Sequence, residues 1–264
     1  MYSAELEKRL LDRLELATRG LESLQLRCVE ESWRSTSKEE HEYFAYGVAR
    51  RVSVMRSALG NVFSLFPVDA KVPIPRDDLV DAQINLHAFV INVSGVFDNF
   101  AWAYLSRHNL NDMFPNARRI GMFRRDFQAV LPNVLVEYLN SQRIQDWYKP
   151  YLTYYRDALA HRIPLYIPPA HWTKEQSGRF QELDQKIHAA IQAHDFDKAE
   201  AMRNEQDTLG TPCDSFYHTF LGDGSKRGVV LHPQMIADSL TVIEFGNLFF
   251  DNWLRPLQKT GSLA

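Results

Sequence analysis

The sequence has little of what marks a secreted or membrane-embedded protein. Only two cysteines, Cys28 and Cys213, occur among 264 residues, which excludes a disulfide scaffold and fits a reducing compartment. The N-terminus carries no basic stretch followed by an apolar one, and no apolar run reaches the length of a membrane span. We therefore expect a cytoplasmic protein without a membrane segment.

Basic charge, phosphate loops and metal-binding spacings are also scarce. The formal net charge is −3, so no global positive field attracts nucleic acid, although a local basic groove remains compatible with it. The glycine-rich stretch 222–225 lacks the Gly-Lys-Ser/Thr core of a phosphate loop. His188 and His194 are too far apart for a helical metal pair, and His87 has no second ligand nearby. We expect no cofactor and no metal.

The sequence does contain long stretches with the hydrophobic period of helices. Hydrophobic residues make up 45% of the chain, which indicates a globular protein. Leucines recur at intervals of three and four over residues 3–28, and Ser37 with Glu40 predicts the start of a second helix over 38–66. Residues 77–106 are the most apolar and should lie at the centre of a bundle. Further helices are predicted over 132–140, 142–161 and 233–254.

Two segments depart from that pattern. Residues 172–210 are highly charged with a thin apolar seam, which predicts a projecting helical hairpin that turns near His194. Residues 215–221 and 228–231 are typical of two strands joined by a tight turn. We therefore predict an all-α fold. It comprises one domain over 1–264, built as a helical bundle with a small β-hairpin and a charged insertion that could contact a protein partner or a second subunit.

The stretch from Tyr154 to Pro164 holds the residues best suited to chemistry. It is helical in composition until proline stops it, so the helix should end near His161. Arg156 and His161 lie about 7–8 Å apart along the axis and roughly 140° apart around it, so they could reach into one groove from two sides. Asp157 shares a face with His161, where a carboxylate could fix the tautomer of the imidazole and favour its protonated form.

These residue types match the needs of RNA cleavage by a 2′-hydroxyl. A fixed cation such as Arg156 stabilises the phosphorane charge, and His161 transfers protons. Two other pairs with four to six residues between an arginine and a histidine, Arg34–His41 and Arg227–His232, occur in the chain, but the first spans a helix break and the second a strand. A second interpretation stays open, in which a surface arginine stands beside a histidine that interacts with the last carbonyls of its helix.

The stretch resembles the motif of HEPN domains, an arginine and a histidine separated by four to six residues, often with a polar residue after the arginine. The resemblance covers residues 77–170 and 231–256, whereas the N-terminal helices over 1–66 and the insertion lie outside it. It implies a helical bundle that pairs two motifs across a homodimer. The groove between them would bind nucleotides or cleave RNA without a metal ion, as in defence or toxin systems.

On that resemblance Arg156 holds phosphate, His161 moves protons and Asp157 orients His161. Many HEPN members carry the motif near the start or middle of a helix, whereas here it stands at the end. The alternative function is a non-catalytic helical scaffold or protein-interaction module, in which the arginine and histidine tie a helix end to its neighbours.

Polar residues in the apolar helix are candidates for substrate binding. Asn85, Asn92 and Asn99 recur every seven residues, and His87 lies on a neighbouring face. They form either a narrow solvent-facing stripe or, with Asn92, Asn99 and His87, the lining of a groove that faces the motif. Arg162, directly after the motif, is a further substrate-binding candidate.

The most basic segment precedes the motif helix. The pairs Arg118-Arg119 and Arg124-Arg125 alternate with Phe123 and Phe127. Such interleaving can follow a nucleic-acid backbone, or it can consist of solvated charges beside buried rings. Tyrosines crowd the next helix, among them Tyr148, and could offer rings for stacking.

Overall fold

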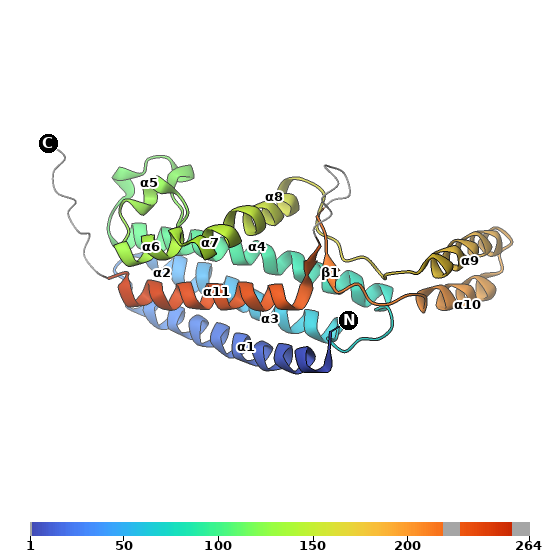
Figure 1. The fold of residues 1–264 in the computed structure, drawn as a ribbon. Coiled ribbons are helices and arrows are strands. Elements are labelled where there is room, and N and C mark those ends of the chain that lie inside the picture. The colour runs from blue at the N-terminus through green and yellow to red at the C-terminus, as the bar shows by residue number, and fades with distance from the viewer. Residues whose placement is uncertain (1, 219–227, 255–264) are drawn as a thin grey trace.

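Four long helical segments form the body of the protein within residues 2–218 and 228–254, the part that the computed structural model describes. They are α1 (Ala4–Trp33), the segment that ends in α3 (Ala49–Leu65), α4 (Arg76–Arg107) and α11 (Leu231–Asn252). Helix α3 packs on both α1 and α4, and α11 lies along α1 and α4 (Figure 1). The predicted all-α bundle is confirmed.

The second segment begins with a cap that also anchors it to α4. Helix α2 (Lys38–Glu42) follows Ser37, whose hydroxyl accepts a hydrogen bond from the Glu40 backbone N–H at 3.1 Å. The Glu40 carboxylate accepts from the backbone N–H of Thr36 at 2.9 Å rather than from that of Ser37. It is fully buried and pairs with Arg107 of α4 at 3.3 Å. The π-helical turn η1 (Tyr43–Val48) then joins α2 to α3.

Helix α4 lies at the centre, as its composition predicts. Its buried aromatic rings face those of α11, with 4.7 Å between the ring centroids of Phe97 and Phe245 and 4.6 Å between those of Phe100 and Phe249. Burying each such side chain contributes about 1.5–3 kcal/mol. One continuous apolar core extends from Leu10 in α1 to α11, so the N-terminal helices share a core with residues 77–170 and with α11.

Short elements connect α4 to the helix that carries the motif. They are η2 (Asn111–Met113), η3 (Ala117–Arg119), α5 (Arg125–Gln128) and α6 (Asn133–Asn140). The helix predicted over 142–161 is continuous but contains a wide turn: α7 (Gln142–Trp147), η4 (Tyr148–Thr153) and α8 (Tyr154–His161). Pro150 explains the π-helical η4, because proline has no N–H and its ring clashes with the carbonyl four residues earlier in an α-helix.

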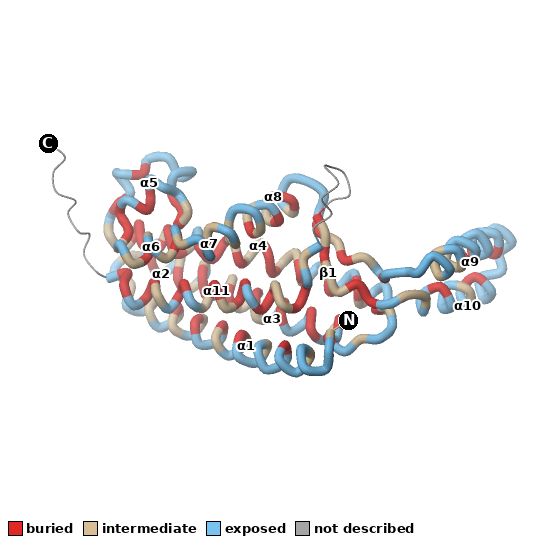
Figure 2. The backbone as a smooth tube through the Cα atoms, in the orientation of Figure 1, coloured by how far each residue is buried: buried red, intermediate tan, exposed pale blue. Residues whose placement is uncertain are grey.

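The charged segment forms the predicted helical hairpin. Helices α9 (Lys174–Gln192) and α10 (Phe196–Asp207) pack against each other and project from the body (Figure 1). The turn between them includes His194, whose φ is 57°. A small separate cluster of Ile187, Ala190 and Ala199 holds the pair together, and most of its remaining surface is exposed (Figure 2).

The β-hairpin is shorter than predicted. Strands β1 (Ser215–Phe216) and β2 (Val229–Val230) are antiparallel, with Ser215 opposite Val230. The turn predicted over 222–225 lies outside the described residues. Helix α11 begins directly after β2, two residues earlier than expected. No helix in the described part of the chain is long and apolar enough to cross a membrane.

Candidate functional site

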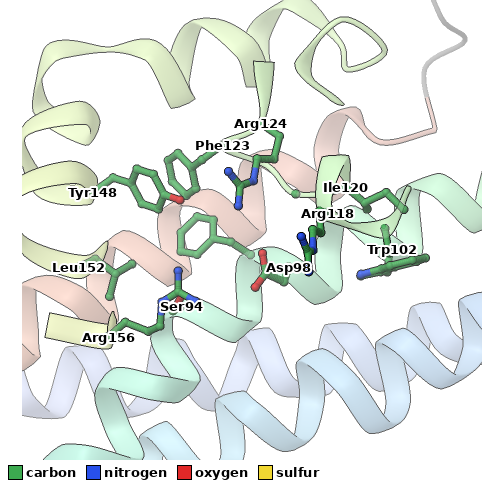
Figure 3. Close-up of a pocket in the computed structure, with 13 residues that line it drawn as sticks. Ser94, Asp98, Trp102, Arg118, Ile120, Phe123, Arg124, Tyr148, Leu152 and Arg156 are labelled. Atoms are coloured by element: carbon green, nitrogen blue, oxygen red, sulfur yellow. The ribbon is translucent and has the colours of Figure 1, made fainter. Parts of the chain in front are cut away.

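A cavity of about 430 Å³ lies beside the motif helix. Helix α4 forms one wall, the segment from Ala117 to Arg124 forms a second, and η4 with α8 forms the third (Figure 3). Arg156 of α8 lines the cavity and is half-buried. Its Nε atom is 2.9 Å from an Asp157 carboxylate oxygen, but the N–H does not point at that oxygen and finds no acceptor among the described residues.

Positive charge dominates the lining of this cavity. Arg118 and Arg124 lie opposite Arg156, with the Asp98 carboxylate between them (Figure 3). Within residues 2–218 and 228–254, neither Arg118 nor Arg124 forms an ion pair, whereas the neighbouring Arg119 pairs with Asp126 at 2.7 Å. Three arginines therefore surround the Asp98 carboxylate, and a second carboxylate, Asp157, lies beside Arg156.

Burial and the nearby arginines act in opposite directions on the pKa of Asp98. Its side chain stays open to solvent at the cavity, yet the surrounding helices displace much of its water, and this desolvation raises the pKa of the carboxyl group. The charges of Arg156, Arg51 and Arg124 oppose that rise.

Aromatic rings form two sides of the cavity. The rings of Phe123 and Tyr148 stack face to face, with centroids 3.6 Å apart and planes 9° apart. Trp102 stacks on Tyr43 with centroids 5.6 Å apart, and it also lines the cavity. The wide turn η4 places Tyr148 there, so the irregular helix has a direct effect on the shape of the site.

His161 lies apart from this cavity. It is the last residue of α8, it is exposed, and its side chain makes no hydrogen bond to any described residue. The predicted contact between Asp157 and His161 is not formed among them, because the Asp157 carboxylate lies against the neighbouring Arg156 instead. The structure thus brings Arg156 to the cavity and leaves His161 on the solvent side of the same helix. The chemical roles of all three residues stay predictions.

The asparagine line faces α3, which differs from both interpretations of the sequence. The Asn99 side-chain oxygen accepts a hydrogen bond from Arg51 Nε at 2.6 Å, and that of Asn92 accepts from Arg51 Nη1 at 3.2 Å. Gly95 makes room for this guanidinium, since a Cβ atom there would lie 2.4 Å from it. Neither asparagine lines the cavity at Arg156, so the expected groove lining is not observed.

The two remaining substrate-binding candidates also lie elsewhere. His87 Nε2 hydrogen-bonds the Leu165 carbonyl at 2.6 Å and so holds the segment after α8 against α4. Arg162 is exposed at the end of α8. Desolvation and the charge of Arg162 lower the pKa of His218, which hydrogen-bonds the Tyr154 hydroxyl at 2.8 Å.

Sequence reasoning assigned no role to several residues that line the cavity, among them Ser94, Asp98 and Trp102. The available signal was the charge of Asp98 in the most apolar helix, since such a group needs a polar partner. The basic segment and Tyr148 were recognised as candidates for contact with nucleic acid, but the pattern did not connect them to Arg156.

No group of three or more histidine, cysteine, aspartate or glutamate side chains is placed to hold a metal ion in the described ranges. Comparisons of the chain with protein-family models, with curated proteins and with solved structures found no match. Any assignment of function therefore depends on the geometry described above.

Proposed function

We propose that this protein is a HEPN-like, homodimeric RNA-binding protein that cleaves RNA without a metal ion in the cytoplasm. The observation that supports it best is the position of Arg156, which faces a cavity that two further arginines line. A guanidinium binds phosphate oxygens through several N–H donors at once and keeps its charge at every physiological pH. The two terminal nitrogens of the Arg156 guanidinium make no hydrogen bond to a described residue, so a ligand oxygen in the cavity would supply an acceptor.

His161 suits the transfer of protons because nothing in the described structure occupies its ring nitrogens. The neutral imidazole would take the proton of a 2′-hydroxyl while that oxygen attacks the phosphorus atom. The bond to the 5′-oxygen then breaks, and a protonated imidazole returns a proton to that oxygen. The products are a 2′,3′-cyclic phosphate and a 5′-hydroxyl end, while arginine stabilises the charge of the transition state.

The test is cleavage of a labelled RNA by purified protein in the presence of a chelator. His161→Ala should abolish cleavage, and Arg156→Ala should weaken both RNA binding and cleavage. His188→Ala, at an exposed histidine of α9, is the matched control and should cleave like the unchanged protein. Equal cleavage by the His161 and His188 variants would reject the catalytic role of His161.

The second candidate is a non-catalytic protein-interaction module. The projecting hairpin favours it, because α9 and α10 have their own small cluster and expose Phe196, which is 62% accessible, beside their turn. A module of this kind needs no chemistry at His161. It predicts intact RNA under every condition of the cleavage assay, and a partner contact that is lost when the hairpin is removed.

A further inference from the structure

The cavity at Arg156 holds more positive charge than its own side chains neutralise. Three arginines and one aspartate line it, and the Asp157 carboxylate beside Arg156 offsets part of the remaining positive charge. Arg118 of η3 and Arg124, just before α5, stay free of ion pairs in the part of the chain that is described. Cations with low-dielectric walls behind them concentrate the field on a bound anion.

We propose that this cavity binds the terminal phosphate of a nucleotide, either at the end of an RNA strand or in a free nucleoside monophosphate. A terminal phosphate carries a charge of about −1.5 to −2 at neutral pH, so it gains more from three surrounding arginines than the single charge of an internal phosphodiester does. The choice of a nucleotide rests on the proposed function, whereas the choice of an anion rests on the three arginines alone.

The remaining lining fits the other parts of a nucleotide. A volume of about 430 Å³ lies in the usual range of small-ligand sites, roughly 300–1,000 Å³. Trp102 on one side and Tyr148 on the other offer ring surfaces for a base, and aromatic stacking tolerates any base. Asp98, between the arginines, accepts a hydrogen bond from a sugar hydroxyl, a role in which carboxylates recur at nucleotide sites.

The test measures the affinity for one short RNA prepared with a 5′-phosphate, with a 3′-phosphate or with hydroxyl ends. Internal 2′-O-methyl groups prevent cleavage during the measurement. A phosphate at one end should raise the affinity at least tenfold at constant salt. Arg118→Ala and Arg124→Ala should each remove that preference, while Arg125→Ala should keep it, because this exposed neighbour does not line the cavity.

Competition identifies the source of the phosphate. Displacement of the RNA by adenosine monophosphate supports a site for free nucleotides as well, and its failure to displace a phosphorylated strand places the site at strand ends. Inorganic phosphate that competes as well as adenosine monophosphate would overturn the nucleotide assignment. Equal affinity for phosphorylated and hydroxyl ends, or equal losses for the Arg124 and Arg125 variants, would overturn the phosphate site itself.

The two proposals fail separately. His161→Ala should retain the preference for a phosphorylated end even where it abolishes cleavage. A protein that shows the preference but cleaves no RNA would contradict the proposed nuclease and leave the phosphate site intact. A protein that cleaves RNA but shows no preference for a phosphorylated end would contradict the phosphate site and leave the proposed nuclease intact.

Discussion

Replacing Asp238 by asparagine should change how the stability of the protein depends on pH. Asp238 of α11 is fully buried, and no cation neutralises its carboxylate in the described structure. Trp147 and Gln234 donate hydrogen bonds to Oδ1 at 2.7 and 2.8 Å, and the Tyr151 hydroxyl donates to Oδ2 at 2.7 Å. Desolvation raises the pKa of Asp238 to about 6, although these hydrogen bonds oppose the rise.

The sign of the effect follows from proton binding. The folded state holds the Asp238 proton up to about pH 6, whereas an unfolded aspartate releases it near 3.8. Between those values the folded state binds more protons, so the free energy of unfolding falls as the pH rises. The shift corresponds to a loss of about 3 kcal/mol across the window.

His232 acts in the opposite direction over nearly the same range. It is buried at the start of α11, where Nε2 hydrogen-bonds the Phe66 carbonyl at 2.7 Å and Nδ1 meets the Tyr2 hydroxyl at 3.1 Å. Desolvation lowers the pKa of His232 from 6.5 to about 4. Below pH 6.5 the unfolded state takes up the proton first, so stability falls by about 3 kcal/mol as the pH drops to 4. The pH dependences that the two groups give to the unfolding free energy therefore largely cancel in the unchanged protein.

Urea denaturation across pH 4 to 7 separates the two contributions. Because His232 is present in both proteins, it cancels when the unfolding free energies of Asp238→Asn and the unchanged protein are subtracted. That difference should shift in favour of the variant by about 3 kcal/mol as the pH rises. Asp184→Asn, an exposed change on α9, serves as the control. If the difference in unfolding free energy between Asp238→Asn and the unchanged protein stays constant within about 0.5 kcal/mol over this pH range, the raised pKa of the buried Asp238 is refuted.

Four further changes test other parts of the structure. Gly95→Ala should destabilise the protein by about 1–2 kcal/mol in urea denaturation. The new Cβ would displace Arg51 from its hydrogen bonds to Asn92 and Asn99, and the higher helix propensity of alanine offsets only part of that loss. Gly60→Ala, where a Cβ meets nothing, should instead stabilise it by about 1 kcal/mol. His161→Ala should alter stability by less than about 0.5 kcal/mol; a larger loss would restore a structural role for this side chain. Replacing 174–207 by a short linker should leave the thermal midpoint of the body unchanged within about 3 °C.

Hydrophobic periodicity predicts the bundle well, because the four long segments bury faces that recur every three or four residues. The helical hairpin is equally visible, since a thin apolar seam between charges suits a pair of helices that pack mainly on each other. The interior of these segments is less predictable. Pro150 forces a π-helical turn inside a helix that still continues, whereas proline in a sequence pattern usually predicts an end.

The asparagine line shows why the site was harder to predict than the fold. A polar stripe on an apolar helix indicates that something polar faces it, but not which element supplies the partner. Here Arg51, from another helix, reaches Asn92 and Asn99 through the space left by Gly95. The cavity was hard to predict for a different reason. Its arginines come from segments far apart in sequence, and they meet because the 117–124 segment and α8 both lie beside α4.

The division of the motif between two surfaces bears directly on the proposed dimer. Arg156 points into the cavity while His161 lies on the exposed side of the same helix, as a separation of roughly 140° around the axis requires. One chain therefore does not aim both groups at a single phosphate. A second copy, with its own α8 alongside, would place one imidazole near the phosphodiester that adjoins the nucleotide held in the other chain's cavity. On this geometry cleavage should depend on protein concentration through the dimer, and full activity from a strictly monomeric protein would contradict it.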